Sequence, residues 1–302
     1  MILSILCIYA FVLLGVFAKQ FFKDEMNERS FVLLSIYFLQ PILAFWGLSS
    51  KPLTTELIQA PMWFLAFSLI TLLLAYASAS LFFTDAKDRS IVTAGTLIGN
   101  TGNLGIPLGI AIFGEASVIY TSLMNFANFF VLYFIGVFLY SKGHYSIKKS
   151  VTNIFRLPVV WAAMGALLLN GWGITIHEAV FRSLEMGAYA AMVLQLMIFG
   201  MYLSQIKLAH INYRLLVHVN LLKYIILPAL FIPLLLWLNF PPLLMGVLLL
   251  ELSVPLAINN INFASLYHCK PLDVTTLVFV SSFIFIGYLV AMVWILKYLG
   301  KL

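Results

Sequence analysis

Charged residues are scarce in this 302-residue sequence. Only 9% of the residues are Asp, Glu, Lys or Arg, whereas 63% are hydrophobic, and the mean hydropathy is +1.05. Soluble domains are about a quarter charged and about half apolar, so this chain lacks the polar residues needed to cover a water-exposed surface. The composition therefore excludes a soluble protein and predicts an integral membrane protein.

Several chemical motifs are also missing. The two cysteines, Cys7 and Cys269, lie in or beside apolar segments and support neither a disulfide framework nor a metal site. The five histidines lack the spacing of a metal site, and the sequence has no phosphate-binding GxxxxGK[ST] loop and no GxSxG nucleophile elbow. We therefore expect no catalytic residues, no metal and no cofactor, and a protein that is not an enzyme.

Apolar runs of about twenty residues recur along the chain, which is the length that an α-helix needs to cross a bilayer. They predict ten transmembrane helices near residues 2–22, 30–48, 62–83, 90–113, 117–140, 157–172, 184–204, 214–238, 243–267 and 273–298. Strands of a membrane barrel would be about ten residues long and alternating, so we expect an all-α polytopic protein. The first run lacks a basic leading segment and a cleavage site, and it is interpreted as a membrane helix rather than a signal peptide.

Basic residues are concentrated in the loops that follow odd-numbered helices. Those loops hold Lys19, Lys23, Arg29, Lys87, Arg89, Lys142, Lys148, Lys149, Arg156, Lys207, Arg214 and Lys270. The other side holds Lys51, Arg182, Lys297 and Lys301. Because cytoplasmic loops carry the excess of Lys and Arg, both termini are predicted to lie outside the cytoplasm. The same distribution explains the net charge of +6 without a nucleic-acid partner.

The basic segment 141–156 divides the predicted helices into two sets of five. Repeat 1 covers about 1–140 and repeat 2 about 157–302 of a single transporter domain spanning 1–302. Because a repeat of five helices enters the membrane from opposite sides in the two halves, the sequence predicts a 5+5 inverted repeat, as in many secondary transporters. The longest polar stretch is this segment, so no loop can hold a soluble domain.

The fourth helix of the first half contains poor helix formers and amides at mid-membrane depth, from Gly99 to Pro107. Proline removes a backbone donor, so this helix is expected to open at Pro107. The restarted half then presents a positive N-terminal end that suits a carboxylate, together with Asn100, Thr101 and Asn103. The alternative is that glycines spaced four residues apart merely permit close helix packing.

The fourth helix of the second half repeats this pattern, since Pro255 precedes Asn259 by four residues. It adds Ser253 and Asn260 to the predicted substrate site. Glu251 lies nearby, and because burial favours the uncharged form of a carboxyl group, it is a candidate proton carrier. Its alternative role is a structural partner of Lys223 or a helix-end residue facing the pore mouth.

Other polar residues in the predicted helices allow two interpretations. Lys223 either neutralises an anionic substrate or extends its ammonium group to the membrane surface. Gln40, Asn125 and Asn128 either line a cavity or form hydrogen bonds between helices.

Two motifs resemble signatures of the auxin efflux carrier family, which includes the plant PIN carriers and bacterial PIN-like permeases. They are Gly99-Asn-Thr-Gly-Asn-Leu-Gly-Ile-Pro-Leu108 and Ser253-Val-Pro-Leu-Ala-Ile-Asn-Asn260. The resemblance extends over the whole chain. It implies a fold like those of the bile-acid symporter and NhaA-type exchangers, with helices 4 and 9 crossing at Pro107 and Pro255 beside the substrate. Helices 1–2 and 6–7 would form a scaffold that often dimerises, and helices 3–5 and 8–10 a mobile transport domain.

The plant carriers have a long loop where this chain has only 141–156, so the resemblance implies a bacterial-type member in the inner membrane. It implies a small carboxylate substrate, such as malate or malonate or an auxin-like acid, moved by alternating access. Membrane lipid and a homodimer through helices 1–2 and 6–7 are the other expected partners. The coupling ion is left open between H⁺ and Na⁺. A sodium-coupled carrier of an organic solute and a lipid-modifying membrane enzyme are the alternatives.

Overall fold

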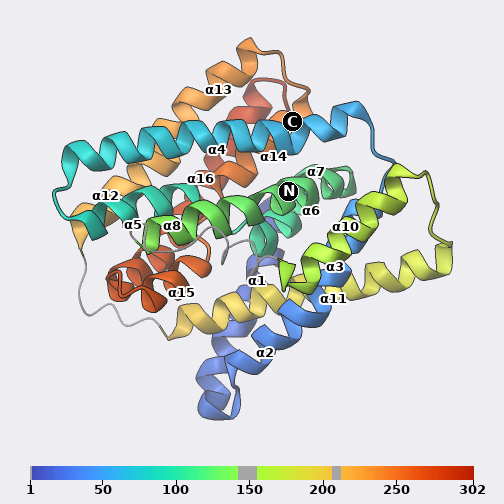
Figure 1. Cartoon of the computed structure of the whole chain (residues 1–302), viewed down its shortest axis with the longest axis horizontal. Helices are drawn as coiled ribbons and strands as arrows, with labels where there is room; N and C mark the ends of the chain where they lie inside the picture. The colour runs from blue at the N-terminus through green and yellow to red at the C-terminus, as the bar shows by residue number, and fades with distance from the viewer. Residues whose placement is uncertain (1, 142–154, 206–211) are drawn as a thin grey trace. The chain divides into compact units, whose positions relative to one another are not determined.

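The computed structural model describes residues 2–141, 155–205 and 212–302 (Figure 1). Regular structure in these ranges is helical, with one isolated β-bridge. The helices are α1 (Ile2–Phe22), α2 (Glu28–Leu34), α3 (Gln40–Ser49), α4 (Thr55–Phe82), α5 (Ala86–Leu97), α6 (Ile106–Phe113), α7 (Val118–Phe130), α8 (Val137–Tyr140), α10 (Pro158–Gly171), α11 (Glu178–Ser204), α12 (Tyr213–Leu221), α13 (Leu227–Trp237), α14 (Pro242–Ser253), α15 (Asn259–Leu266) and α16 (Pro271–Tyr298).

The chain is an all-helical polytopic membrane protein. In the described ranges, six helical stretches are long and apolar enough to cross a membrane: Glu28–Ser49, Leu57–Phe82, Glu115–Tyr140, Glu178–Ser204, Tyr213–Trp237 and Pro271–Tyr298. Four shorter apolar helices are Leu6–Phe22, Thr101–Phe113, Pro158–Gly171 and Pro242–Ser253. Each predicted range overlaps helical structure, but 90–113 and 243–267 each contain a break, and the count of ten crossings stays a prediction. Residues 142–154, most of the predicted basic loop, and Lys207 lie outside the described residues.

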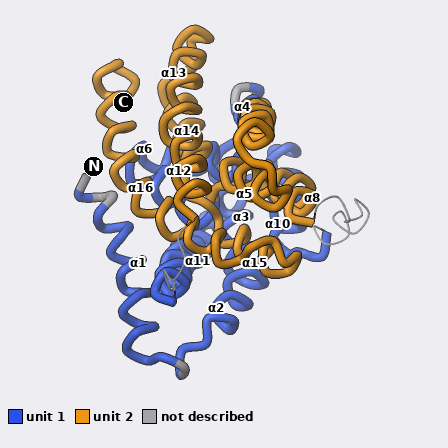
Figure 2. The backbone as a smooth tube through the Cα atoms, turned by 90° about the vertical axis from the view of Figure 1, so that its left-hand side faces the viewer, with its two compact units in different colours: residues 1–61, 102–126, 152–205 blue, residues 62–101, 127–151, 206–302 orange. Residues whose placement is uncertain are grey.

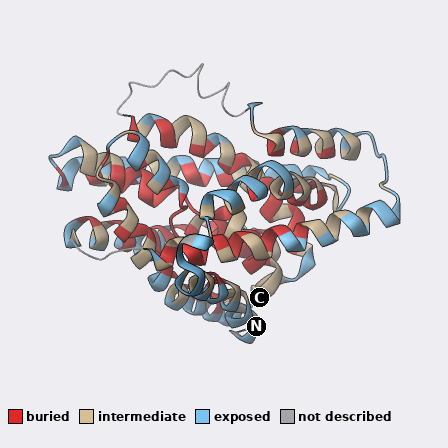
Figure 3. Cartoon of the chain, turned by 90° about the horizontal axis from the view of Figure 1, so that it is seen from below, coloured by how far each residue is buried: buried red, intermediate tan, exposed pale blue. Residues whose placement is uncertain are grey.

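Helix α4 is apolar on both its buried and its exposed face. Leu65, Leu69 and Leu73 follow each other at helical spacing and are exposed, whereas Phe64 and Phe67 are buried. Figure 3 shows buried and exposed positions alternating along the helices in the same way. A helix that is apolar all round belongs in a protein core or in a membrane. The exposed leucine face is therefore suited to contact with lipid.

The chain forms two compact units, shown in different colours in Figure 2. Unit 1 contains residues 1–61, 102–126 and 152–205, and unit 2 contains residues 62–101, 127–151 and 206–302. Each unit draws on both predicted repeats. The boundary falls within the predicted fourth helix, so Asn100 and Thr101 belong to unit 2 whereas Asn103 and Pro107 belong to unit 1.

In unit 1, α1 packs directly against α11 because two glycines let their backbones meet. A Cβ atom on Gly15 would lie 2.0 Å from the carbonyl oxygen of Met197, and one on Gly200 would lie 1.9 Å from that of Val12. Small residues allow this close approach between membrane helices, where packing rather than water exclusion drives association.

In unit 2, ionic contacts fasten the start of α16 to the start of α5. The Nζ atom of Lys270 lies 2.7 Å from Asp85 and 2.5 Å from Asp88. Asp85 also caps α5 by accepting from the N–H of Lys87 at 2.8 Å. Burial lowers the pKa of Lys270, but the hydrogen bonds and charges of the two aspartates outweigh it and raise the pKa overall.

The predicted fourth helix opens earlier than its proline. Helix α5 ends at Leu97, and a π-helical turn at Thr101–Gly105 leads directly into α6. Pro107 lies in the first turn of α6, where a proline is compatible with a helix. The prediction of an opening at Pro107 is therefore wrong. The second break, between Ser253 and Asn259, includes Pro255 as predicted.

Candidate functional site

Two helix breaks of unit 2 pair with each other through their backbones. The N–H of Asn100 donates to the carbonyl oxygen of Pro255 at 2.8 Å, and the N–H of Ala257 donates to the carbonyl oxygen of Ile98 at 3.2 Å. In a membrane, backbone groups that a helix break exposes must find partners inside the protein. Each break therefore satisfies the other.

These bonds form an antiparallel bridge between Gly99 and Leu256, which is the crossing point of the two segments. A Cβ atom on Gly99 would lie 2.8 Å from Cγ2 of Val254 and 3.2 Å from its carbonyl oxygen, so the approach requires glycine. Pro255 is next to the bridge. The prediction that Pro107 forms the other side of the crossing is wrong, because Gly99 occupies that place.

Asn260 holds the two breaks together with its side chain. Its Nδ2 donates to the carbonyl oxygens of Ile98 at 3.1 Å and Ala257 at 2.9 Å, and its Oδ1 accepts from the hydroxyl of Tyr140 at 3.0 Å. Asn260 and Tyr140 are both buried. Both amide donors of Asn260 are therefore engaged inside the protein.

Asn128 supports the first break from a neighbouring helix. Its Nδ2 donates to Oγ1 of Thr101 at 2.9 Å and approaches the carbonyl oxygen of Gly99 at 3.4 Å. Of the two interpretations of Asn128, hydrogen bonding between helices is therefore confirmed.

Asn100 has a different environment. The residue is only 5% exposed, and its Nδ2 has no hydrogen-bond partner within the described part of the chain. An unpaired buried amide costs free energy that a fold without another use for it would avoid. Asn100 thus places a buried side-chain donor beside the crossing that no described residue engages.

The remaining predicted residues have varied surroundings. Asn259, the first residue of α15, is exposed, and its Oδ1 lies 3.5 Å from Nδ2 of Asn262. Ser253 is buried, and its hydroxyl shares a 2.8 Å hydrogen bond with the hydroxyl of Tyr288. In unit 1, Asn103 is half-buried and Pro107 is buried.

Tyr140 and Tyr288 were not predicted as parts of the site. In the sequence they resemble the other aromatic residues of membrane helices, and no motif surrounds them. Only the position of each hydroxyl, which depends on the tertiary fold, distinguishes them.

Lys223 lies in the π-helical segment Leu222–Ile226 and is 1% exposed. Its Nζ donates to the carbonyl oxygen of Thr96 at 3.1 Å and to that of Leu252 at 3.3 Å. The prediction that this lysine extends to the membrane surface is therefore wrong, since its ammonium group is directed at two buried backbone carbonyls.

Glu251, in the last turn of α14, is also buried, and neither of its carboxyl oxygens has a hydrogen-bond partner in the described residues. No ion pair within 4.0 Å joins it to Lys223 in that part of the chain. The alternative interpretation, in which Glu251 pairs with Lys223, is therefore wrong.

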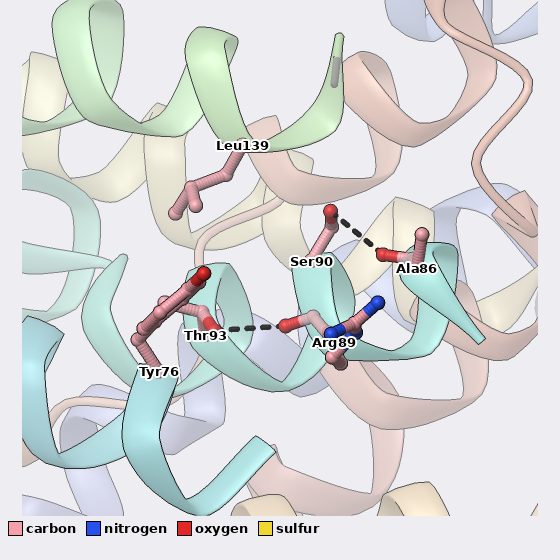
Figure 4. A pocket seen from close by; sticks show the side chains of 6 residues that line it. All are labelled: Tyr76, Ala86, Arg89, Ser90, Thr93 and Leu139. Atoms are coloured by element: carbon pink, nitrogen blue, oxygen red, sulfur yellow. Dashed lines mark hydrogen bonds between the residues drawn. The ribbon is translucent and has the colours of Figure 1, made fainter. Parts of the chain in front are cut away.

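A pocket of about 210 Å³ lies in unit 2 near the start of α5 (Figure 4). It is lined by Tyr76, Ala86, Arg89, Ser90, Thr93 and Leu139. The hydroxyls of Ser90 and Thr93 donate to carbonyls of their own helix. Thr93, the lining residue nearest the first break along α5, is about 8 Å from Ile98 by the helical rise, and no lining residue belongs to the paired breaks. In the described residues, no group of three or more His, Cys, Asp or Glu side chains could hold a metal ion.

Two comparisons with known proteins each cover nearly the whole chain. Residues 1–295 match the membrane transport protein family. The chain is also similar to the uncharacterized transporter MJ1031 of Methanocaldococcus jannaschii, with 23% identity over 290 residues that cover 92% of this chain and 93% of the relative. The resemblance inferred from the two motifs is confirmed by the family match. The chain belongs to the membrane transport protein family, the family of the auxin efflux carriers.

Proposed function

We propose that this transporter is a secondary carrier that moves a small organic anion across the membrane by alternating access. The observation that carries the proposal is the pairing of two helix breaks, at Ile98–Asn100 and Pro255–Ala257, beside the side-chain Nδ2 of Asn100, which has no partner among the described residues. Broken helices of this kind form the substrate and ion sites of many secondary transporters.

The anion preference follows from the helix ends at the breaks. Helical structure restarts at Thr101 after the first break, and α15 starts at Asn259 after the second. The N-terminal end of a helix carries a partial positive charge and free N–H groups, which favour a carboxylate. The amides of Asn100 and Asn259 add neutral donors. In this proposal Asn260 holds the two breaks together, and Ser253 and Pro255 line the substrate site.

The topology proposed for this carrier is ten transmembrane helices in a 5+5 inverted repeat, with both termini outside the cytoplasm of a bacterial inner membrane. Its support is that the helix break recurs in the fourth predicted helix of each half and that Lys and Arg favour one set of loops. A homodimer through helices 1–2 and 6–7 belongs to the same proposal.

The proposed substrates are small carboxylates, with malate and malonate first and an auxin-like acid second. The short loop between the predicted halves favours the bacterial-type substrates. Glu251 is the proposed proton carrier, because burying a charged carboxylate without partners is expensive and binding a proton removes that cost. Replacing it with glutamine should then abolish any dependence of transport on a proton gradient, and retained dependence would assign the proton to another group.

The test is uptake of labelled malonate and malate into proteoliposomes that contain the purified protein. Asn103→Ala and Asn259→Ala should each abolish uptake while the unfolding temperature stays near that of the wild type. Ser265→Ala, which alters an exposed residue of the same helix as Asn259, is the matched control and should transport normally. Wild-type uptake by both asparagine variants, or no uptake of any carboxylate by the wild type, would refute the proposal.

A further inference from the structure

Lys223 joins the ends of two half-helices. Thr96 lies in the last turn of α5 and Leu252 in the last turn of α14, and the carbonyl oxygens of both accept from the same ammonium group. These two helices are the ones that end at the paired breaks. A single side chain from a third helical segment therefore bonds to both helices just before they open.

The last carbonyls of a helix have no intrahelical partner and together carry a partial negative charge. A lysine near a helix C-terminus stabilises such carbonyls by donating to them. Here two C-terminal ends face one amino group, and the backbone dipoles of both helices favour its charged form.

No acidic side chain takes over this role among the residues that the structure describes. Among the side chains that the structure describes, no carboxylate oxygen lies within 4.0 Å of Nζ of Lys223. The side chain is buried, so water does not replace a partner at the surface. The backbone carbonyls are thus the groups that hold this charge.

In sodium-coupled carriers, backbone carbonyls at the ends of broken helices are ligands for Na⁺. We propose that the ammonium group of Lys223, attached to the chain through its own side chain, occupies the place at the paired breaks where a Na⁺ ion would otherwise bind. This carrier therefore works without Na⁺. This inference rests on the proposed transport function and assigns Lys223 as a positioning residue for the breaks.

The test replaces the tethered cation with a free one. Lys223→Ala should unfold at a lower temperature than the wild type in choline chloride. Sodium chloride at equal ionic strength should raise its unfolding temperature in a saturable way, because a ligand that binds only the folded state stabilises it. The n-propylammonium ion, which matches the part of the side chain that alanine lacks, should do the same. Neither cation should affect the wild type.

Two variants separate a vacated cation site from a general loss of stability. Lys223→Met fills the path of the lysine stem without a charge and should be destabilised without rescue by either cation. Lys297→Ala removes an exposed lysine from the last turn of α16 and should respond to neither cation. If Lys223→Ala does not fold, Lys223→Gln is compared with Lys223→Arg, and only the arginine variant should keep wild-type stability.

A saturable stabilisation of the wild type by Na⁺ but not by choline would overturn the inference. So would a Lys223→Ala protein that neither cation stabilises, or a Lys223→Gln protein as stable as the wild type. Carboxylate uptake by the wild type should be equal in Na⁺ and in choline, and Na⁺-dependent uptake would also overturn it. Since unfolding temperatures require no substrate, they decide on the cation site even if no carboxylate is transported.

Discussion

The hydroxyl of Tyr140 donates a 3.0 Å hydrogen bond to Oδ1 of Asn260, and both residues are buried. Tyr140→Phe removes this donor and leaves the amide oxygen unpaired, which should lower the free energy of unfolding by about 1–3 kcal/mol. Asn260→Ala should cost more, because it also removes two bonds to the backbone of the breaks. Thermal unfolding of the purified protein measures both.

The two substitutions should not add, since each removes the same hydrogen bond. A double-mutant cycle should give an interaction energy of about 0.5–3 kcal/mol. Tyr298→Phe, at an exposed tyrosine of α16, is the control and should leave stability unchanged. Additive effects of Tyr140→Phe and Asn260→Ala would contradict the bond.

Asn100 should behave in the opposite way to Asn260. Because its Nδ2 is buried without a partner in the described residues, Asn100→Ala should leave the unfolding temperature at or above the wild-type value while carboxylate uptake is lost. Asn128→Ala, which removes bonds to Thr101 and Gly99, should instead lower the unfolding temperature. An Asn100→Ala protein that is unstable but transports normally would show that this amide is structural.

Part of this arrangement could be predicted from the sequence. Glycine, asparagine and proline in an apolar run indicate a break wherever they occur, so the existence of both breaks was predictable. Their register was not, because Pro107 fits the first turn of a helix and the close approach falls instead at Gly99. Side-chain roles were the hardest to predict. Asn100 and Asn260 are the same residue type, and only tertiary contacts leave Nδ2 of Asn100 without a partner among the described residues while Nδ2 of Asn260 donates twice.

Gly99 should not tolerate a larger residue. In Gly99→Ala the new Cβ would lie 2.8 Å from Cγ2 of Val254 and 3.2 Å from its carbonyl oxygen, so the backbone bridge to Leu256 must separate. We expect a loss of about 1–3 kcal/mol, in the range of overpacked sites, and a loss of uptake. Unfolding and uptake assays check both. Gly287→Ala in α16 is the matched control, because a Cβ atom at that position would meet no described atom within 4 Å apart from its own helical turn, and it should not lower stability.

Lys270→Gln should lower stability only modestly, by about 0.2–1 kcal/mol, because the lysine side chain is 31% exposed and solvent weakens its pairs with Asp85 and Asp88. These aspartates raise the pKa of Lys270 above its usual 10.5 despite partial burial. The stabilisation should therefore be complete below that pH and disappear as the pH rises through the folded-state pKa. The difference in unfolding temperature between wild type and variant, followed from neutral to strongly alkaline pH, measures this. Lys297→Gln, at an exposed lysine, is the control and should unfold at the wild-type temperature. If the difference in unfolding temperature between wild type and Lys270→Gln grew with pH, the ion pairs would be contradicted.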